Sequence, residues 1–192
     1  GPDGGGGPVS LRTIVGMEYA APGMAGTFAA LRAPGAKHYP DEYSLAKMQP
    51  KATDPINFKP LDRYIGDFQG AGFAELVITL KTADSKWWIK DSKNNFTPKP
   101  EYMDAYDAWV RAVAERYDGD GVDDMPGLLH PVRFIEIGSE FSSFEPEPVA
   151  DYLEMLGRAY RGAHAASSGV QVLHAAILAT TAFKDHPTSA EY

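Results

Sequence analysis

The sequence predicts an α/β domain built around a parallel β-sheet, and three observations predict it. A helical pattern followed by a short apolar run occurs three times along the chain. The apolar run at 75–80 (ELVITL) lacks alternating polarity, which is typical of a strand covered on both faces. The chain has 192 residues, 44% of them hydrophobic, which suits one packed domain. Parallel neighbours need long crossovers, and the repeated helices supply them.

The elements follow in order after a start that we expect to lie outside the fold. Residues 1–8 (GPDGGGGP) have no apolar side chains apart from proline, so they are expected to form a flexible linker or a tag remnant. The domain is therefore expected to cover 9–192. The β-rich run at 13–17 (TIVGM) predicts a first strand, and a second strand is predicted to begin at 36–39.

Three helix-and-strand units are predicted next, each from an apolar stripe at helical spacing. The first helix spans 61–72, between Pro60 and the C-capping Gly72, and leads into the strand at 75–80. The second follows Pro100 and precedes a strand at 132–137 (VRFIEI). The third begins at Pro148 and precedes a strand at 170–178. The stripes comprise Leu61, Tyr64, Ile65, Phe68 and Ala71; Tyr102, Tyr106, Trp109, Val110, Val113 and Tyr117; and Tyr152, Leu153, Leu156, Tyr160 and Ala163.

Two architectures fit this order of elements. A doubly wound open sheet of five strands suits a domain of about 190 residues, whereas a (β/α)8 barrel typically needs about 250. Length alone therefore favours the open sheet. However, the glycine-rich fingerprints that nucleotide-binding open sheets often carry are absent from the sequence.

Composition excludes several classes of partner. The net charge is -8 and the sequence has no basic block, so we expect no nucleic-acid partner. No apolar run approaches the roughly 20 residues of a membrane span. The sequence contains no cysteine, which excludes disulfides and thiolate metal sites. We expect a secreted or periplasmic location rather than a cytoplasmic one.

The segment DGDGVDD suggests a calcium loop, because clustered carboxylates suit hard cations. Its spacing departs from the helix-loop-helix calcium pattern, since counting from Asp118 places Val122 at position five and Asp123 at position six. We therefore expect a solvated acidic loop, with no metal site, at Asp118, Asp120, Asp123 and Asp124.

The segment FIEIGSEFSSF at 134–144 resembles the fourth strand of clan A glycoside hydrolases, which ends in an Asn-Glu pair. Ser139 and Glu140 occupy the matching positions here. The residue order Leu61-Asp62 and Gly72-Phe73, and the stretch 151–178, also resemble family 39 and 42 enzymes. The resemblance implies the amino-terminal part of a (β/α)8 barrel, roughly its first five units, with Glu140 as the general acid/base.

The resemblance also implies retaining hydrolysis of O-glycosidic bonds in a polysaccharide or oligosaccharide, without a cofactor. Retaining hydrolysis needs two carboxyl groups about 5 to 5.5 Å apart. In clan A the second one ends strand seven, so the nucleophile is expected outside this chain. A missing carboxyl-terminal half or a second chain would then complete the barrel. Ser139 replaces the usual Asn, which keeps open the alternative of a non-catalytic, carbohydrate-binding relative.

Further candidates for substrate contact follow the predicted strands. Trp87 and Trp88 follow the strand at 75–80, where aromatic rings could stack on sugars, although packing under a loop is equally ordinary. His38 and Glu42 lie near the end of the second predicted strand and could line the same cleft or belong to a polar loop. His174, inside a predicted strand, is expected to be a hydrogen-bonded core residue.

Overall fold

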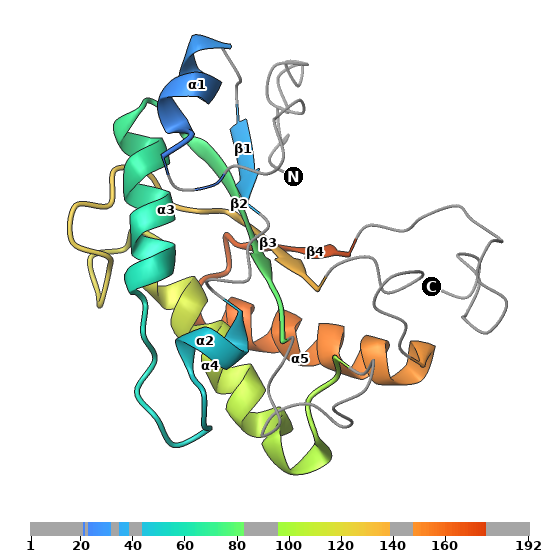
Figure 1. Cartoon of the computed structure of the whole chain (residues 1–192). Helices are drawn as coiled ribbons and strands as arrows, with labels where there is room; N and C mark the ends of the chain where they lie inside the picture. Colours follow the sequence, from blue (N-terminus) through green and yellow to red (C-terminus); the bar gives the residue numbers. More distant parts are fainter. Residues whose placement is uncertain are drawn as a thin grey trace, which may run out of the picture.

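The computed structural model describes residues 21, 23–31, 35–38, 44–82, 96–138 and 148–175, with the side chain of His38 excepted. The strands β1 (Gly35–His38), β2 (Glu75–Leu80), β3 (Phe134–Ile137) and β4 (Gln171–His174) form one sheet. Their order is β1-β2-β3-β4, and each neighbouring pair is parallel (Figure 1). The strand predicted at 13–17 lies outside the described residues.

The strand order distinguishes between the two architectures that fit the sequence. A doubly wound sheet reverses its strand order at a switch point and carries helices on both faces. Here each strand lies beside its predecessor, so right-handed crossovers place successive helices on one face. The helices α3 (Lys59–Gly70), α4 (Met103–Arg116) and α5 (Val149–Ala166) lie on the same side of the sheet in Figure 1. The fold is part of a (β/α)8 barrel, and the expectation from length alone is wrong.

The end of α3 confirms the predicted glycine cap. Gly72 has φ +96°, in the left-handed region that favours glycine. The Gly72 N–H donates to the Gln69 carbonyl at 2.9 Å, and the Phe73 N–H donates to the Phe68 carbonyl at 3.0 Å. The Phe68 and Phe73 rings lie 5.3 Å apart between centroids. These contacts form a Schellman motif, which ends the helix and turns the chain into β2.

The other predicted helices are present with small shifts at their ends. A short 3-10 turn, η3 (Pro100–Tyr102), precedes α4, and Pro148 is the residue before α5. Two short helices were not expected from the sequence: α1 (Ala25–Ala30) and α2 (Leu45–Met48). Both are too short to present a repeating apolar stripe, which is the signal that predicted the longer helices.

The two faces of the sheet differ in character because side chains alternate along a strand. One face packs against the helices and is almost completely buried through Ala36, Leu76, Ile78, Leu80, Ile135 and Ile137. The other face carries Lys37 from β1, Thr79 from β2 and Glu136 from β3. In a closed barrel this second face lines the interior, so the interior layer contains charged and polar groups here.

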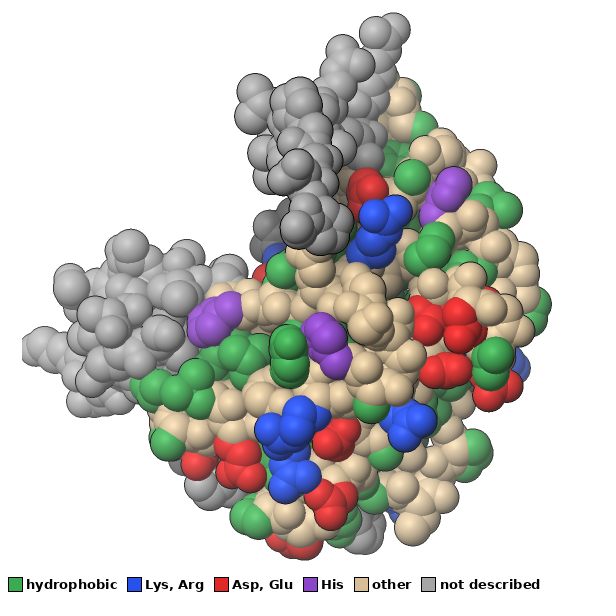
Figure 2. Space-filling model, turned by 180° about the vertical axis from the view of Figure 1, so that it is seen from behind, with side chains coloured by type: hydrophobic (Ala, Val, Ile, Leu, Met, Phe, Trp, Pro, Cys, Tyr) green, Lys and Arg blue, Asp and Glu red, His purple; other side chains and the backbone are tan. Residues whose placement is uncertain are grey.

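Charged side chains of both signs share the face of the molecule that Figure 2 shows. Figure 2 shows Lys and Arg side chains interspersed with Asp and Glu side chains on one face, without an extended basic patch among the described residues. Among the described helices, none combines the length and the apolar character that a membrane crossing requires.

Candidate functional site

The carboxyl ends of the four strands meet at one edge of the sheet, called here the carboxyl edge. Barrel enzymes bind substrate and place catalytic groups at this edge. The strands β1, β2, β3 and β4 end there at His38, Leu80, Ile137 and His174. The candidate site is therefore built from these strand ends and from the segments that follow them.

The predicted site residues Glu42, Trp87, Trp88, Ser139 and Glu140 lie outside the described residues, as does the His38 side chain. The structure does describe the strand ends that precede them in the chain. His38 is the last residue of β1, and Glu140 follows the last residue of β3 by three positions. The contacts of these six side chains stay predictions.

The end of β3 turns sharply just before Ser139. Gly138 has φ +74°, a conformation that side chains with a Cβ rarely adopt. The Gly138 N–H donates to the Leu80 carbonyl at 2.8 Å, which continues the pairing of β2 with β3. The hydrogen bond to β2 therefore holds the backbone at Gly138, and the chain turns out of the sheet at this residue.

Tyr152 lies between the ends of β3 and β4. Its side chain is completely buried, and its hydroxyl donates to the Ile137 carbonyl at 3.3 Å. The same hydroxyl accepts the Ala175 N–H at 2.9 Å. Sequence analysis placed Tyr152 only on an apolar helical stripe. No sequence signal identifies this contact, because it joins three elements that are distant along the chain.

His174, at the end of β4, is a hydrogen-bonded and half-buried residue, as expected from the sequence. Its Nδ1 lies 2.6 Å from the Ala175 carbonyl oxygen. Its ring meets the Tyr152 ring edge-on, with centroids 4.9 Å apart. Its register partner is Ile137, whose side chain faces the helices. His174 is thus placed on the helix-covered face of the sheet rather than on the interior face.

The interior face of the sheet holds a compact polar group below the carboxyl edge. The Lys37 ammonium lies 2.9 Å from both carboxylate oxygens of Glu136. The Thr79 hydroxyl donates to Glu136 Oε2 at 2.6 Å. Glu136 is buried, and these contacts supply the partners that a buried carboxylate requires. Sequence analysis did not predict this group, although Glu136 lies inside the apolar run VRFIEI and a carboxylate in such a run indicates a buried partner.

The acidic loop between α4 and β3 brings together three of its four predicted carboxylates. Side-chain oxygens of Asp118, Asp120 and Asp124 lie within 4.8 Å of one another. The Asp124 carboxylate accepts the N–H groups of Gly119 at 3.0 Å and Gly121 at 2.8 Å. These bonds tie the Asp124 carboxylate to the backbone of its own loop.

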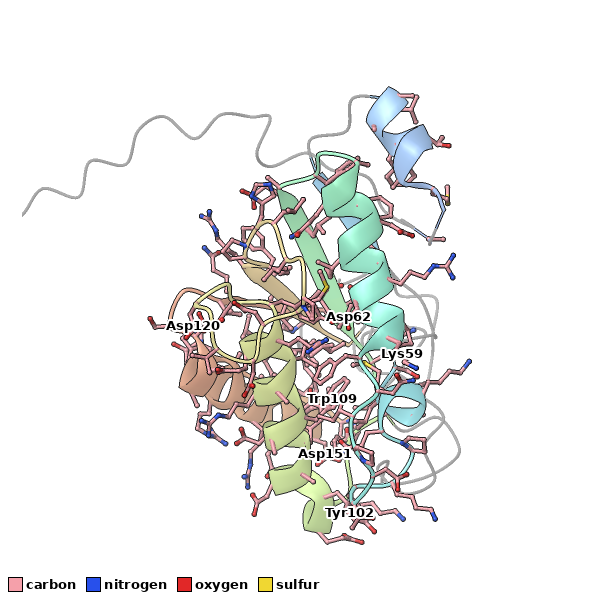
Figure 3. All side chains as sticks on the ribbon, turned by 90° about the vertical axis from the view of Figure 1, so that its left-hand side faces the viewer. Lys59, Asp62, Tyr102, Trp109, Asp120 and Asp151 are labelled. Atoms are coloured by element: carbon pink, nitrogen blue, oxygen red, sulfur yellow. The ribbon has the colours of Figure 1, made fainter. Side chains whose placement is uncertain are left out.

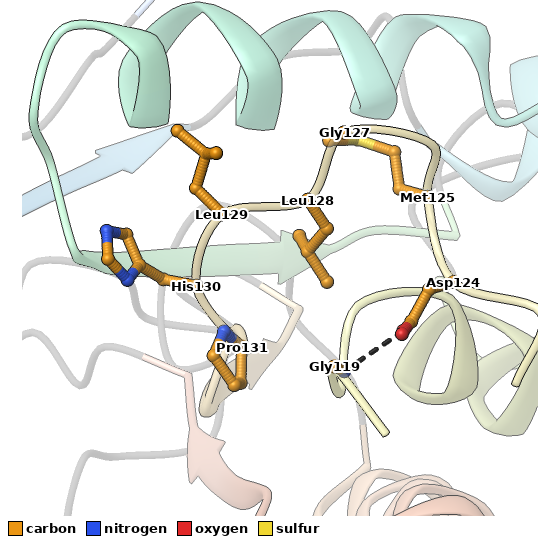
Figure 4. A pocket seen from close by; sticks show the side chains of 8 residues that line it. All are labelled: Gly119, Asp124, Met125, Gly127, Leu128, Leu129, His130 and Pro131. Atoms are coloured by element: carbon orange, nitrogen blue, oxygen red, sulfur yellow. Dashed lines mark hydrogen bonds between the residues drawn. The ribbon is translucent and has the colours of Figure 1, made fainter. Parts of the chain in front are cut away.

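Burial raises the pKa of Asp118, and the charges of Asp120 and Asp124 raise it further. A hollow of about 270 Å³ beside this loop is lined by residues that include Asp124, Leu129 and His130 (Figure 4). The loop precedes β3, so it lies at the opposite end of the strands from the carboxyl edge. It is therefore separate from the candidate site.

Comparison with known proteins supports the fold and leaves the activity open. The sequence matches no protein-family model, and no curated protein sequence matches it. The solved structures that are similar to this chain include three that are described here. A glucosidase from Croceicoccus marinus has a TM-score of 0.62 at 15% identity, over 82% of this chain and 34% of its own.

A second solved structure, described as a glycoside hydrolase, has a TM-score of 0.56 at 10% identity, over 84% of this chain and 48% of its own. An endoglucanase from Pseudomonas stutzeri has a TM-score of 0.53 at 14% identity, over 84% of this chain and 46% of its own. The chain thus spans between a third and a half of each of these proteins. At these identities the similarity shows the fold, which is part of a (β/α)8 barrel.

Proposed function

We propose that this chain is the amino-terminal part of the catalytic barrel of a retaining glycoside hydrolase related to families 39 and 42, with Glu140 as general acid/base. The observation that carries the proposal is the position of Glu140, three residues after the carboxyl end of β3 in a sequentially ordered parallel sheet. Catalytic groups of barrel enzymes follow strand ends at this edge. The similarity to three glycoside-hydrolase structures supports the same class.

The proposed chemistry divides the work between two carboxyl groups. Glu140 donates a proton to the glycosidic oxygen as the bond to the sugar carbon breaks. A second carboxylate, from outside residues 1–192, forms the covalent glycosyl intermediate. Glu140, now ionised, then accepts a proton from the water that attacks this intermediate. The first step requires the Glu140 carboxyl to be protonated in the free enzyme, which partial burial and a neighbouring carboxylate would favour, and the second step requires it to be ionised.

The remaining predicted residues are proposed to bind the carbohydrate substrate, a polysaccharide or oligosaccharide. Trp87 and Trp88 follow β2 and would offer flat aromatic faces to sugar rings. His38 and Glu42 follow β1 and would donate and accept hydrogen bonds with hydroxyl groups. Ser139 would contact a hydroxyl next to the scissile bond, directly or through water. The enzyme is proposed to act in a secreted or periplasmic location.

The test is Glu140→Gln in the full-length protein, assayed with phenyl and 2,4-dinitrophenyl glucosides and cellobiosides. A phenolate leaving group needs protonation, whereas 2,4-dinitrophenolate leaves without it. We expect kcat for the phenyl substrates to fall by about 100-fold or more, within the range for general acid catalysis. Formation of the glycosyl intermediate from the dinitrophenyl substrates should change much less.

A matched control is Glu154→Gln, which makes the same change at an exposed position of α5 and should leave both rates unchanged. Equal rates for Glu140→Gln and the wild-type protein on the phenyl substrates would contradict the proposal. A wild-type protein that binds glucan oligosaccharides but releases no sugar would instead support the non-catalytic alternative.

A further inference from the structure

The hydrogen-bond ladder between β3 and β4 is interrupted at the carboxyl edge by a side chain. At the start of the pair, the Gln171 N–H donates directly to the Arg133 carbonyl at 2.6 Å. A parallel ladder repeats every two residues along each strand. With Ile137 opposite His174, the same series would place the Ala175 N–H on the Ile137 carbonyl. The Tyr152 hydroxyl occupies this place, because it accepts from Ala175 at 2.9 Å and donates to Ile137 at 3.3 Å.

The opposite side of β3 is paired without an intermediate. The Gly138 N–H donates directly to the Leu80 carbonyl at 2.8 Å, so β2 and β3 stay paired to their ends. Between β3 and β4, the two hydrogen bonds of the Tyr152 hydroxyl stand in place of one direct hydrogen bond between the strands. The end of β3 is therefore hydrogen-bonded directly to β2 and is joined to β4 through the Tyr152 hydroxyl.

The Tyr152 side chain is held rigidly in this place. It belongs to the first turn of α5, where its N–H donates to the Pro148 carbonyl at 3.1 Å. Its side chain is completely buried, and its ring meets the His174 ring edge-on. A buried aromatic ring in a close-packed interior has little freedom to move. A shift of α5 would therefore change the distance between the ends of β3 and β4.

We infer that Tyr152 is a positioning residue for the proposed acid, and this inference rests on the proposed function of Glu140. By setting the separation of β3 from β4, the Tyr152 hydroxyl determines the point from which the chain leaves the sheet at Gly138. Glu140 follows that point by two residues. Proton transfer to a leaving oxygen depends on the position of the acid to within about 1 Å, so a change in the strand ends reduces the rate.

The test is Tyr152→Phe in the full-length protein, with the same phenyl and 2,4-dinitrophenyl substrates. The variant keeps the ring in the core and removes the hydrogen bonds of the hydroxyl to Ile137 and Ala175. We expect kcat for the phenyl substrates to fall by about 10- to 100-fold, a part of the contribution of a general acid. Formation of the glycosyl intermediate from the dinitrophenyl substrates should stay within about twofold, because this step does not need the acid.

The matched control is Tyr106→Phe. Tyr106 is a buried tyrosine on α4 whose hydroxyl has no hydrogen-bond partner among the described residues. This variant should keep the wild-type dependence on the leaving group. Incorporation of 3-fluorotyrosine at position 152 provides a second variant, which changes the acidity of the hydroxyl and keeps its place. Because this variant keeps the hydroxyl between Ile137 and Ala175, we expect it to keep the wild-type dependence on the leaving group.

The outcomes separate this inference from the proposed function. If Glu140→Gln loses phenyl-glycoside hydrolysis while Tyr152→Phe behaves like the wild-type protein, the inference is wrong and the proposed function stands. If Glu140→Gln keeps full activity, both are wrong. An equal loss on both kinds of leaving group in Tyr152→Phe would indicate a general structural role and would also overturn the inference.

Discussion

At the scale of single residues, glycines mark the places where the backbone approaches a neighbour or turns. Gly162 on α5 lies against the backbone of α4. A Cβ built there would lie 2.6 Å from the Asp107 carbonyl oxygen and 2.6 Å from its Oδ1. Gly157 lies on the same helix, where a Cβ would meet a side-chain atom of Arg161 at 3.6 Å, an ordinary contact. The two glycines of α5 therefore have different roles.

We predict that Gly162→Ala and Gly157→Ala change stability in opposite directions. Gly162→Ala forces α4 and α5 apart and should lower the free energy of unfolding by about 1–3 kcal/mol. Gly157→Ala improves helix propensity without a clash and should raise it by up to about 1 kcal/mol. Urea unfolding followed by circular dichroism measures both. Equal effects of the two substitutions would contradict the close contact of the helices.

The pKa of Asp118 predicts a pH-dependent effect on stability. Burial raises this pKa in the folded state, so the folded protein binds the proton more tightly than the unfolded chain. Ionisation of Asp118 therefore costs stability as the pH rises above about 4, the pKa of an unperturbed aspartate. Asp118→Asn should raise the Tm at pH 7, and this gain should shrink as the pH falls below about 4.

Thermal unfolding at a series of pH values measures the difference between Asp118→Asn and the wild-type protein. Glu154→Gln on the exposed face of α5 is the control for the change in net charge. A gain that is constant with pH, or that grows as the pH falls, would contradict the predicted sign.

At the scale of the elements, α3 and α4 are joined by a group of charge-assisted hydrogen bonds. The Arg116 guanidinium donates to the two carboxylate oxygens of Asp62 at 2.9 and 2.7 Å. The Tyr117 hydroxyl donates to the same carboxylate at 2.8 Å, and the guanidinium lies over the Phe58 ring at 4.7 Å. Figure 3 shows Asp62 on α3 among the side chains between the two helices. A bidentate pair with a third donor is stronger than a simple surface ion pair.

We predict that Asp62→Asn lowers the free energy of unfolding by about 1–3 kcal/mol, because it removes the negative charge and replaces one of the two accepting oxygens with an NH2 donor. Asp67→Asn is the control on the same helix. Asp67 pairs with the exposed Arg63 at 3.8 Å, and loss of such a pair should cost less than about 0.5 kcal/mol. Denaturant titration of both variants checks the difference, and equal losses would show that the Asp62 group contributes little.

At the scale of the whole molecule, the described sheet is an arc of a barrel. Its outer strands are β1 and β4, and its interior face carries Lys37, Thr79 and Glu136. In a closed barrel each outer strand pairs with a further strand, and interior side chains fill the centre. The similar solved structures are longer than this chain, which covers 34% to 48% of their lengths.

We predict that residues 1–192 produced alone self-associate or bind a chain that supplies the remaining strands, because unpaired strand edges invite further pairing. Analytical ultracentrifugation across a range of protein concentrations measures this. A chain extended to a full barrel should be monodisperse under the same conditions. A stable monomer of residues 1–192 with native-like unfolding cooperativity would contradict the prediction.

The sequence by itself determined the features that depend on neighbours along the chain. Apolar periodicity located α3, α4 and α5, the run ELVITL coincides with β2, and Gly72 ends its helix as predicted. These features follow from local backbone geometry and the spacing of apolar side chains. The short α1 and α2 were missed because a helix of four to six residues has no such spacing.

Only the tertiary structure decided which distant residues meet. The sequential strand order selected the barrel over the open sheet, although the length favoured the latter. The pairing of Lys37 with Glu136 spans 99 positions, and the Tyr152 hydroxyl joins the ends of two strands to a helix. Contacts of this kind depend on how twisted strands and packed helices meet in space. No local pattern records that geometry, so the sequence could name Glu140 as a candidate but could not identify Tyr152 beside the strand end that leads to it.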